Sequence, residues 1–245
     1  MRKLILTTTA LALTAGMAMA GGHESTVRMG TEGAYPPYNF INDAGDVDGF
    51  EIELGNELCK RAELKCEWVT NEWDSIIPNL VSGNYDTIVA GMSITDERDE
   101  VIDFTQEYMP ADPSVFAALT ADANLMGGVI AAQTGTIQAS YVASMDGATL
   151  VEFATPDETI AAVRNGEADA VLADKAYLSP ILAESGGALV FAGEDIMIGG
   201  GVGMGVRESD AELKGKMDAA IATMKADGTL NTMIIKWFGD DATTF

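Results

Sequence analysis

The chain repeats one segment of its own sequence, and this repeat limits the folds that it can adopt. Residues 74–90 read DSIIPNLVSGNYDTIVA, and residues 157–173 read DETIAAVRNGEADAVLA, at a constant offset of 83. In each copy a helical pattern ends at a glycine, and three residues later an aspartate precedes a short apolar strand. Two such units predict two α/β lobes of similar plan, each with a mostly parallel sheet.

The repeat also indicates where a ligand would bind. Ligands of open α/β sheets bind beyond the carboxyl ends of the strands. The residues directly after the two repeated strands are Gly91 and Asp174. Position alone therefore makes Asp174 a candidate, although an aspartate at a strand end can instead cap the next helix, here the one that starts at Lys175.

The stretch after the first copy contains a cation in an unusual position. Thr95 is a suitable N-cap for a helix whose first turn includes Arg98. A cation there opposes the helix dipole, whereas the free backbone N–H groups favour an anion, so a bound anion would remove the conflict. The alternative is an exposed arginine that pairs with Asp99, Glu100 or Asp103.

Several segments of the chain resemble one known family. Residues 93–98 (SITDER) and 104–108 (FTQEY) resemble the S-I-T-x-x-R and F-T/S-x-x-Y motifs of solute-binding protein family 3, the polar amino-acid-binding proteins of ABC importers. Residues 30–38 (GTEGAYPPY), residues 49–54 (GFEIEL) and the R-x-x-D-x-E-L, D-G-T and W-F motifs between Arg207 and Phe238 also match family patterns. The resemblance covers nearly the whole chain after residue 20.

This resemblance implies an α/β, two-lobed periplasmic-binding-protein fold of type II, whose lobes are joined by two hinge crossovers. It assigns residues 21–111 and 203–245 to lobe 1 and residues 112–202 to lobe 2. We expect the first crossover at residues 112–119 and the return in the glycine-rich stretch 196–204. Such a protein closes its lobes over a ligand.

The resemblance also implies roles for individual residues. In the family the motif arginine binds the α-carboxylate of an amino acid with help from a neighbouring serine or threonine, which carries over to Arg98 and Ser93. Asp174 would accept the α-ammonium group. Residues 133–138 (QTGTIQ) resemble the Q-x-G-T-T turn that adds to the carboxylate site. Here the second threonine is Ile137, which leaves Thr136 and a backbone amide as candidates.

The remaining candidates would surround the side chain of the ligand. The resemblance gives Tyr35 and Trp73 as walls, and Glu32 as a partner for a polar or cationic tip. The alternatives are a loop aromatic, a core tryptophan and a solvated loop acid, respectively. The complete set of expected ligand-binding residues is Glu32, Tyr35, Trp73, Gly91, Met92, Ser93, Arg98, Thr136, Ile137 and Asp174.

The N-terminal segment has the features of a secretory signal peptide. A basic start is followed by an apolar stretch and by Ala18-Met19-Ala20, which predicts cleavage after Ala20 and a periplasmic protein. Since Gly21 rather than cysteine follows, we expect no lipid anchor. An N-terminal membrane anchor is the alternative.

In a secreted chain two cysteines favour a disulfide over a metal site. Cys59 and Cys66 are seven residues apart, so their bridge would close a small loop. We expect no metal, because His23 is the only histidine, and no cofactor. The 13 methionines are more simply interpreted as core filler than as metal ligands.

The formal net charge of −24 excludes one class of partner. Such a surface repels nucleic acid and anionic lipid. The expected partners are a small-molecule amino acid and an inner-membrane ABC permease, and we expect a monomer.

These expectations define a periplasmic receptor for an amino acid. Glu32 and similarity to the lysine/arginine/ornithine and histidine branch favour a basic ligand: arginine, lysine, ornithine or histidine. An opine or a neutral polar amino acid is the alternative ligand. A dehydratase-type enzyme on the same fold and a soluble partner of a chemoreceptor are alternative functions. The lack of histidine in the lobes, of a G-x-S-x-G motif and of a cysteine–histidine pair argues against an enzyme.

Overall fold

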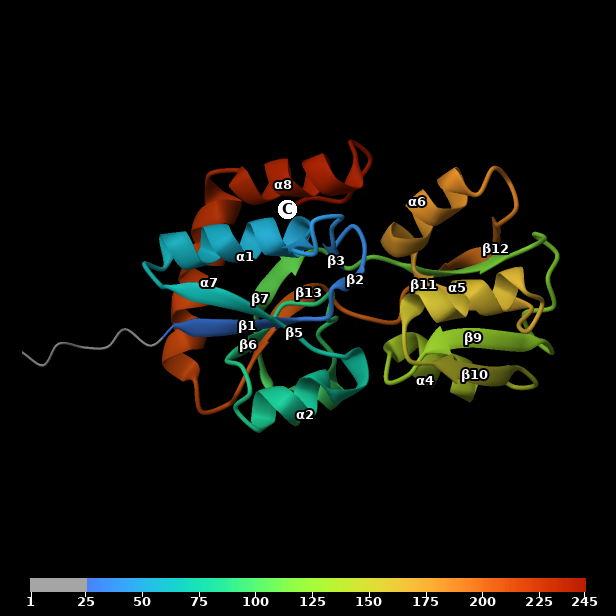
Figure 1. The fold of residues 1–245 in the computed structure, drawn as a ribbon, viewed down its shortest axis with the longest axis horizontal. Helices are drawn as coiled ribbons and strands as arrows, with labels where there is room; N and C mark the ends of the chain where they lie inside the picture. Colours follow the sequence, from blue (N-terminus) through green and yellow to red (C-terminus); the bar gives the residue numbers. More distant parts are fainter. Residues whose placement is uncertain (1–25) are drawn as a thin grey trace, which may run out of the picture.

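The structure is a computed structural model that describes residues 26–245 (Figure 1). The predicted signal peptide, its cleavage after Ala20, and His23 lie outside these residues. Within the described range no helix is both long and apolar enough to cross a membrane.

The chain forms two five-stranded sheets, which we take as the centres of two lobes. The first sheet contains, in spatial order, β5 (Cys66–Thr70), β1 (Val27–Thr31), β6 (Thr87–Ile88), β13 (Val202–Val206) and β7 (Asp103–Met109). The second contains β10 (Thr149–Phe153), β9 (Val129–Gln133), β11 (Ala170–Asp174), β8 (Ser114–Ala118) and β12 (Val190–Ile196).

The two sheets have the same plan, as the sequence repeat predicts. In the first sheet β1 is parallel to β5 and β6, and β13 is antiparallel to its neighbours. In the second sheet β9 is parallel to β10 and β11, and β8 is antiparallel to its neighbours. Each mostly parallel sheet therefore has one reversed strand in the same spatial position.

Two aspartates at equivalent repeat positions join strands in the same way. Asp86 Oδ2 accepts a hydrogen bond from the backbone N–H of Arg28 at 2.9 Å, at the start of β1. Asp169 Oδ2 accepts one from the backbone N–H of Val129 at 2.7 Å, at the start of β9. The repeated aspartate, which directly precedes the central strand of each sheet (β6 or β11), thus ties that strand to its parallel neighbour.

Helices cover both faces of each sheet (Figure 1). The helices of the first lobe are α1 (Phe50–Arg61), α2 (Ile76–Val81), α3 (Asp96–Asp99), α7 (Ala211–Ala226) and α8 (Thr229–Phe238), with a 3-10 helix at Trp73–Ser75. Those of the second lobe are α4 (Ile137–Ser144), α5 (Pro156–Arg164) and α6 (Lys175–Glu184).

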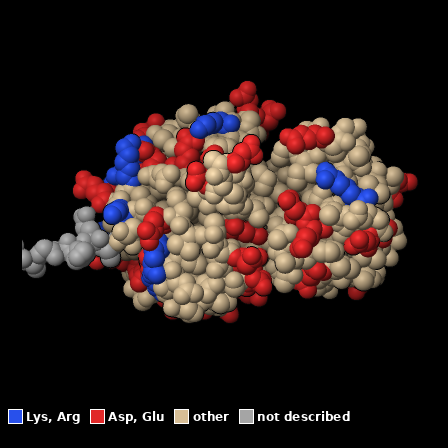
Figure 2. Space-filling model, viewed as in Figure 1, with Lys and Arg blue, Asp and Glu red and all other residues tan. Residues whose placement is uncertain are grey.

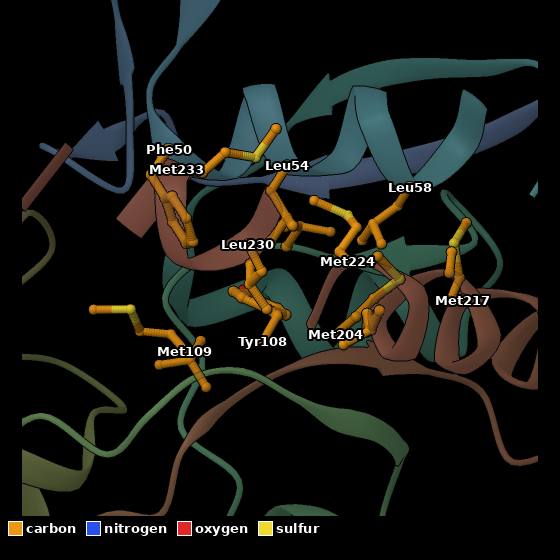
Figure 3. Packing of buried hydrophobic residues seen from close by; sticks show 14 of the residues in the cluster. Phe50, Leu54, Leu58, Tyr108, Met109, Met204, Met217, Met224, Leu230 and Met233 are labelled. Atoms are coloured by element: carbon orange, nitrogen blue, oxygen red, sulfur yellow. The ribbon is translucent and has the colours of Figure 1, made fainter. Parts of the chain in front are cut away.

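Methionines fill much of the core of the first lobe, between the sheet and α1, α7 and α8. Figure 3 shows this cluster, in which Met204, Met217 and Met224 have no exposed surface. Their unbranched side chains suit the irregular space between helices that cross a twisted sheet. The interpretation as core filler holds for these methionines, whereas Met126 and Met197 are exposed.

A short third sheet lies beside α1 in the first lobe. It consists of β2 (Ala34–Tyr35), β3 (Asn39–Ile41) and β4 (Val47–Asp48). Gly49 connects it to α1 with a φ of 124°, and a Cβ atom there would lie 2.5 Å from the carbonyl oxygen of Tyr38. Only glycine permits this close approach.

The crossovers between the sheets are shorter than the sequence predicts. Residues 114–118 form β8 in the second sheet, so only residues 110–113 pass from β7 to β8. On the return, residues 197–201 connect β12 to β13. The expectation of a crossover over residues 112–119 was wrong for most of its length, because the apolar run 114–118 pairs with β11 and β12.

Cys59 and Cys66 form the expected disulfide, which joins the end of α1 to the start of β5. Replacing both with alanine removes a constraint on the unfolded chain. For a loop this short we expect the free energy of unfolding to fall by about 2.5 kcal/mol. Urea denaturation of the wild type and the double variant measures this difference. As a control, added reductant should lower the unfolding midpoint of the wild type only. Equal midpoints would contradict the prediction.

Candidate functional site

A cleft lies between the two lobes, where strands of both sheets end. It contains about 350 Å³ of empty space, part of it open to solvent. The lining residues are Glu32, Tyr35, Trp73, Ala90, Gly91, Ser93, Arg98, Gln133, Thr136, Ile137, Gln138 and Asp174.

Equivalent strands of the two lobes supply the polar groups of this cleft. Glu32 follows β1, and Gln133 ends β9, which has the same place in the second sheet. Gly91 follows β6 after a short connection, and Asp174 ends β11. The carboxyl ends of these parallel strands thus bring residues from four distant segments together.

Arg98 lies in the cleft with much of its guanidinium group unbonded. Thr95 caps α3 by accepting a hydrogen bond from the backbone N–H of Arg98 at 3.3 Å. The Arg98 Nη1 donates to the carbonyl oxygen of Ser93 at 2.8 Å, and the guanidinium carbon lies 5.4 Å from the ring centre of Trp73. These contacts leave Nε and Nη2 without a hydrogen-bond partner among residues 26–245.

The surroundings of Arg98 decide between the two interpretations of its sequence position. Its side chain is partly buried, and none of Asp99, Glu100 and Asp103 forms an ion pair with it; Asp103 pairs with Lys214 instead. Burial lowers the pKa of Arg98 to about 10, so it remains charged at neutral pH. The interpretation as an exposed, acid-paired arginine was wrong.

Asp174 faces Arg98 from the second lobe. Its Oδ2 accepts a hydrogen bond from the Tyr35 hydroxyl at 2.9 Å, and its Oδ1 accepts one from Gln138 Nε2 at 2.7 Å. It occupies the N-cap position of α6, yet its side chain makes no capping bond. Burial raises the pKa of Asp174 to about 6, with a further contribution from Asp112. The side chain is therefore directed to the cleft rather than to the helix.

Glu32 is held by the second lobe. Gln133 Nε2 donates to Glu32 Oε1 at 2.6 Å and to the carbonyl oxygen of Ala154 at 3.0 Å. Burial raises the pKa of Glu32 to about 7, although the bond from Gln133 lowers it. Glu32 is thus a partly buried acid, not a solvated loop residue.

The two aromatic candidates also bridge the lobes. Tyr35 stacks on Tyr177 with ring centres 4.3 Å apart, and Trp73 Nε1 donates to the carbonyl oxygen of Gly135 at 3.3 Å. Trp73 is 9% exposed and belongs to a core cluster as well as to the cleft wall. Both the core and the binding-site interpretations of Trp73 therefore describe part of its environment.

The side chains of two expected site residues, Thr136 and Met92, have structural roles in this protein. Thr136 caps α4: its hydroxyl accepts from the backbone N–H of Ala139 at 3.1 Å and donates to the carbonyl oxygen of Gln133 at 2.7 Å. The Met92 side chain has no exposed surface and lies in the core, outside the cleft lining. A contact from Met92 to a ligand could therefore come only from its backbone.

The structure adds Ala90, Gln133 and Gln138 to the site. Gln133 and Gln138 lie within the turn that resembles the family motif, but their bonds are to residues 101 and 36 positions away. Nothing in the local sequence gives those partners. The one available signal was the position of Gln133 at the end of a strand equivalent to β1.

Comparison with known proteins identifies the family. The model of the bacterial extracellular solute-binding proteins, family 3, matches residues 27–240. The chain belongs to this family. It is 34% identical to the lysine/arginine/ornithine-binding periplasmic protein of Escherichia coli K12, and the match covers 97% of each chain.

Solved structures agree in fold. A periplasmic His/Glu/Gln/Arg/opine family-binding protein from Silicibacter pomeroyi, crystallised with lysine, is 74% identical with a TM-score of 0.88, over 90% of this chain and all of that one. An ancestral amino acid-binding protein, a precursor of cyclohexadienyl dehydratase, is 30% identical with a TM-score of 0.79, over 87% of this chain and 95% of that one. The two-lobed type II fold expected for this family is confirmed.

The pKa of Glu32 gives a prediction for the unliganded protein. Because burial raises this pKa from 4.5 to about 7, the folded state binds more protons than the unfolded state in that range, and stability falls as pH rises. From about pH 5 to 8, the free energy of unfolding of the wild type should fall by about 2–3 kcal/mol relative to Glu32→Gln. Urea denaturation across this range measures the difference. A pH-independent difference would mean that Glu32 is solvated.

Proposed function

We propose that this chain is the periplasmic receptor of an ABC importer for amino acids, and that it binds a ligand with a basic side chain. The observation that carries this proposal is the placement of Arg98 and Asp174 in one cleft, with Glu32 as a second acid. An α-amino acid has one anionic and one cationic group at its α-carbon, so it complements the first two residues. The match to a lysine/arginine/ornithine-binding protein and the lysine complex of a relative support the same ligand class.

In this proposal Arg98 holds the α-carboxylate. Its unbonded Nε and Nη2 can form a bidentate pair with a carboxylate, which a lysine side chain could not reproduce. Ser93 and Thr136 lie in the cleft wall, and the backbone N–H groups at the start of α4, from Ile137, add donors. The ligand carboxylate would take the place of the water that remains around the partly buried Arg98 guanidinium.

Asp174 receives the α-ammonium group. Its two oxygens accept bonds from Tyr35 and Gln138 in this structure, and each oxygen has further acceptor capacity. The backbone at Gly91 and Met92 lies beside this point on the first lobe. A bound cation would lower the pKa of Asp174 and keep it charged.

Glu32 receives the cationic tip of the ligand, between walls formed by Tyr35 and Trp73. This assignment separates the basic amino acids from neutral polar amino acids, which have no cationic tip to pair with Glu32. Opines carry an additional carboxylate on the α-nitrogen, where it would lie near Asp174, and the repulsion between these two negative charges would oppose their binding.

The lobes, residues 21–111 with 203–245 and residues 112–202, would close over the ligand by bending at the crossovers 110–113 and 197–201. The closed monomer would deliver the amino acid to an inner-membrane permease. The N-terminal signal peptide would direct export to the periplasm and be removed by cleavage after Ala20. The chain acts without cofactor and without catalysis in this proposal.

The first test is calorimetric titration of ligand-stripped protein with lysine, arginine, ornithine, histidine, glutamine and octopine. We expect at least one basic amino acid to bind at least tenfold more tightly than glutamine, which has no cationic tip for Glu32, and than octopine, whose second carboxylate on the α-nitrogen would lie near Asp174. Tighter binding of glutamine or octopine would show that the protein serves one of the alternative ligands, a neutral polar amino acid or an opine. Release of a phenyl product from prephenate or arogenate would favour the dehydratase alternative.

The second test separates charge from geometry at Arg98. Arg98→Lys keeps the cation but loses the bidentate fork, so we expect lysine affinity to fall by about 2–5 kcal/mol, or more than tenfold. Arg164→Lys on the exposed end of α5 is the matched control and should bind as the wild type does. Unchanged affinity in Arg98→Lys would show that Arg98 does not hold the carboxylate.

A further inference from the structure

Glu51 is a buried acid in the first turn of α1 that does not line the cleft. Its side chain has no exposed surface. Removing a carboxyl group from water is unfavourable, and a well-packed apolar residue usually fills such a position at lower cost in stability. The hydrogen bonds of Glu51 therefore show what is gained by keeping an acid there.

All three hydrogen-bond donors to Glu51 belong to segments near the cleft or the crossovers. Glu51 Oε1 accepts from the backbone N–H of Gly91 at 2.7 Å and from the hydroxyl of Tyr108, near the end of β7. Glu51 Oε2 accepts from Asn39 Nδ2 at 2.7 Å. Asn39 Oδ1 in turn accepts from the backbone N–H of Gly33, also at 2.7 Å.

These bonds connect two ligand-site segments through one carboxyl group. Gly33 directly follows Glu32, and Gly91 itself lines the cleft. Both glycines have left-handed backbone, with φ of 76° and 62°. Glycine segments have many accessible conformations, so a buried hydrogen bond at each one selects a single conformation.

The start of α1 does not itself require this acid. The N–H groups of Phe50 and Glu51 donate to the carbonyl oxygens of Pro37 and Tyr38, at 3.0 and 2.8 Å. Glu53, two residues later, has a different role: it accepts from Lys236 and Trp237 and so ties α1 to α8. The two acids of the same turn therefore act on different parts of the molecule.

We propose that Glu51 is a positioning residue for the ligand site: through Gly91 directly, and through Asn39 and Gly33, it fixes the backbone on which ligand contacts depend. This inference rests on the proposed function and deepens it. Glu51 itself does not touch the ligand. Its loss would leave the cleft residues present but their backbone free to reorient.

The substitution Glu51→Gln tests this because an amide cannot reproduce both sets of bonds. If its oxygen faces Gly91, its NH₂ group opposes the NH₂ group of Asn39, which must then rotate and release Gly33. If its oxygen faces Asn39, the NH₂ group opposes the N–H of Gly91. In either orientation one of the two glycine segments loses its acceptor.

We expect Glu51→Gln to bind lysine about tenfold to a hundredfold more weakly than the wild type in calorimetric titration. Hydrogen exchange of the unliganded variant should become faster in peptides that cover residues 32–34 or 90–92, and not across the sheets. A merely structural role would lower the melting temperature and leave the lysine Kd and these local rates unchanged. That result would overturn the proposal.

Glu53→Gln is the matched control, since it removes an acid from the same turn without contact to the cleft segments. It should bind lysine as the wild type does, even if its melting temperature falls. If Glu51→Gln does not fold, Asn39→Ala carries the test by removing the link between Glu51 Oε2 and the backbone N–H of Gly33, with faster exchange at residues 32–34 and weaker lysine binding expected. Unchanged exchange and unchanged binding in Asn39→Ala would then overturn the proposal.

The exchange measurement also separates this inference from the proposed function. If wild-type protein binds no basic amino acid, the proposed ligand class is wrong. Faster exchange at residues 32–34 or 90–92 in Glu51→Gln would then still support the positioning role. If the wild type binds lysine while Glu51→Gln matches it in Kd and in exchange, the function stands and the inference about Glu51 fails.

Discussion

The site depends on one geometric constraint: the carboxyl ends of the parallel strands in the two sheets face the same cleft. Because β1 and β9 have equivalent positions, the residues that follow or end them, Glu32 and Gln133, meet across the cleft at 2.6 Å. The same equivalence relates Gly91 to Asp174. The parallel strands of one sheet have their carboxyl ends on the same side, and here those sides of the two sheets face each other, which doubles the number of segments at the cleft.

The second determinant is how the cleft accommodates charges that it partly buries. Tyr35 and Gln138 donate to Asp174, and Gln133 donates to Glu32, so both acids have neutral partners from other segments. Arg98 has one backbone acceptor and an aromatic neighbour. Neutral hydrogen bonds reduce the cost of desolvation without cancelling the charges. In the proposed function a basic amino acid would supply one opposite charge for each of the three residues: a carboxylate for Arg98 and a cation for each acid.

Next to the cleft, the first lobe contains the hydrogen bonds of Glu51 and a tightly packed core. Glu51 bonds directly to Gly91 and Tyr108, while Gly49 lets α1 begin against the loop at Tyr38. Methionine-rich packing then holds α1 to α7 and α8 (Figure 3). Acidic side chains are spread over the visible surface of both lobes (Figure 2), in keeping with the negative net charge. The segments of the proposed ligand site in the first lobe are thus hydrogen-bonded to this interior.

The sequence by itself determined the two-unit plan, the capped start of α3 and the disulfide, and its resemblance to the family indicated the main polar residues of the cleft. A helix cap and a strand end are local patterns, and the internal repeat is found by comparing two short segments of the chain. Only the tertiary structure decided that residues 114–118 are a strand, that Gln133 bonds to Glu32, and that Glu51 supports Gly91. The partners in these contacts are 40 or more residues apart along the chain. Such contacts arise only when the chain folds, because no local pattern specifies which distant group fills a buried hydrogen bond.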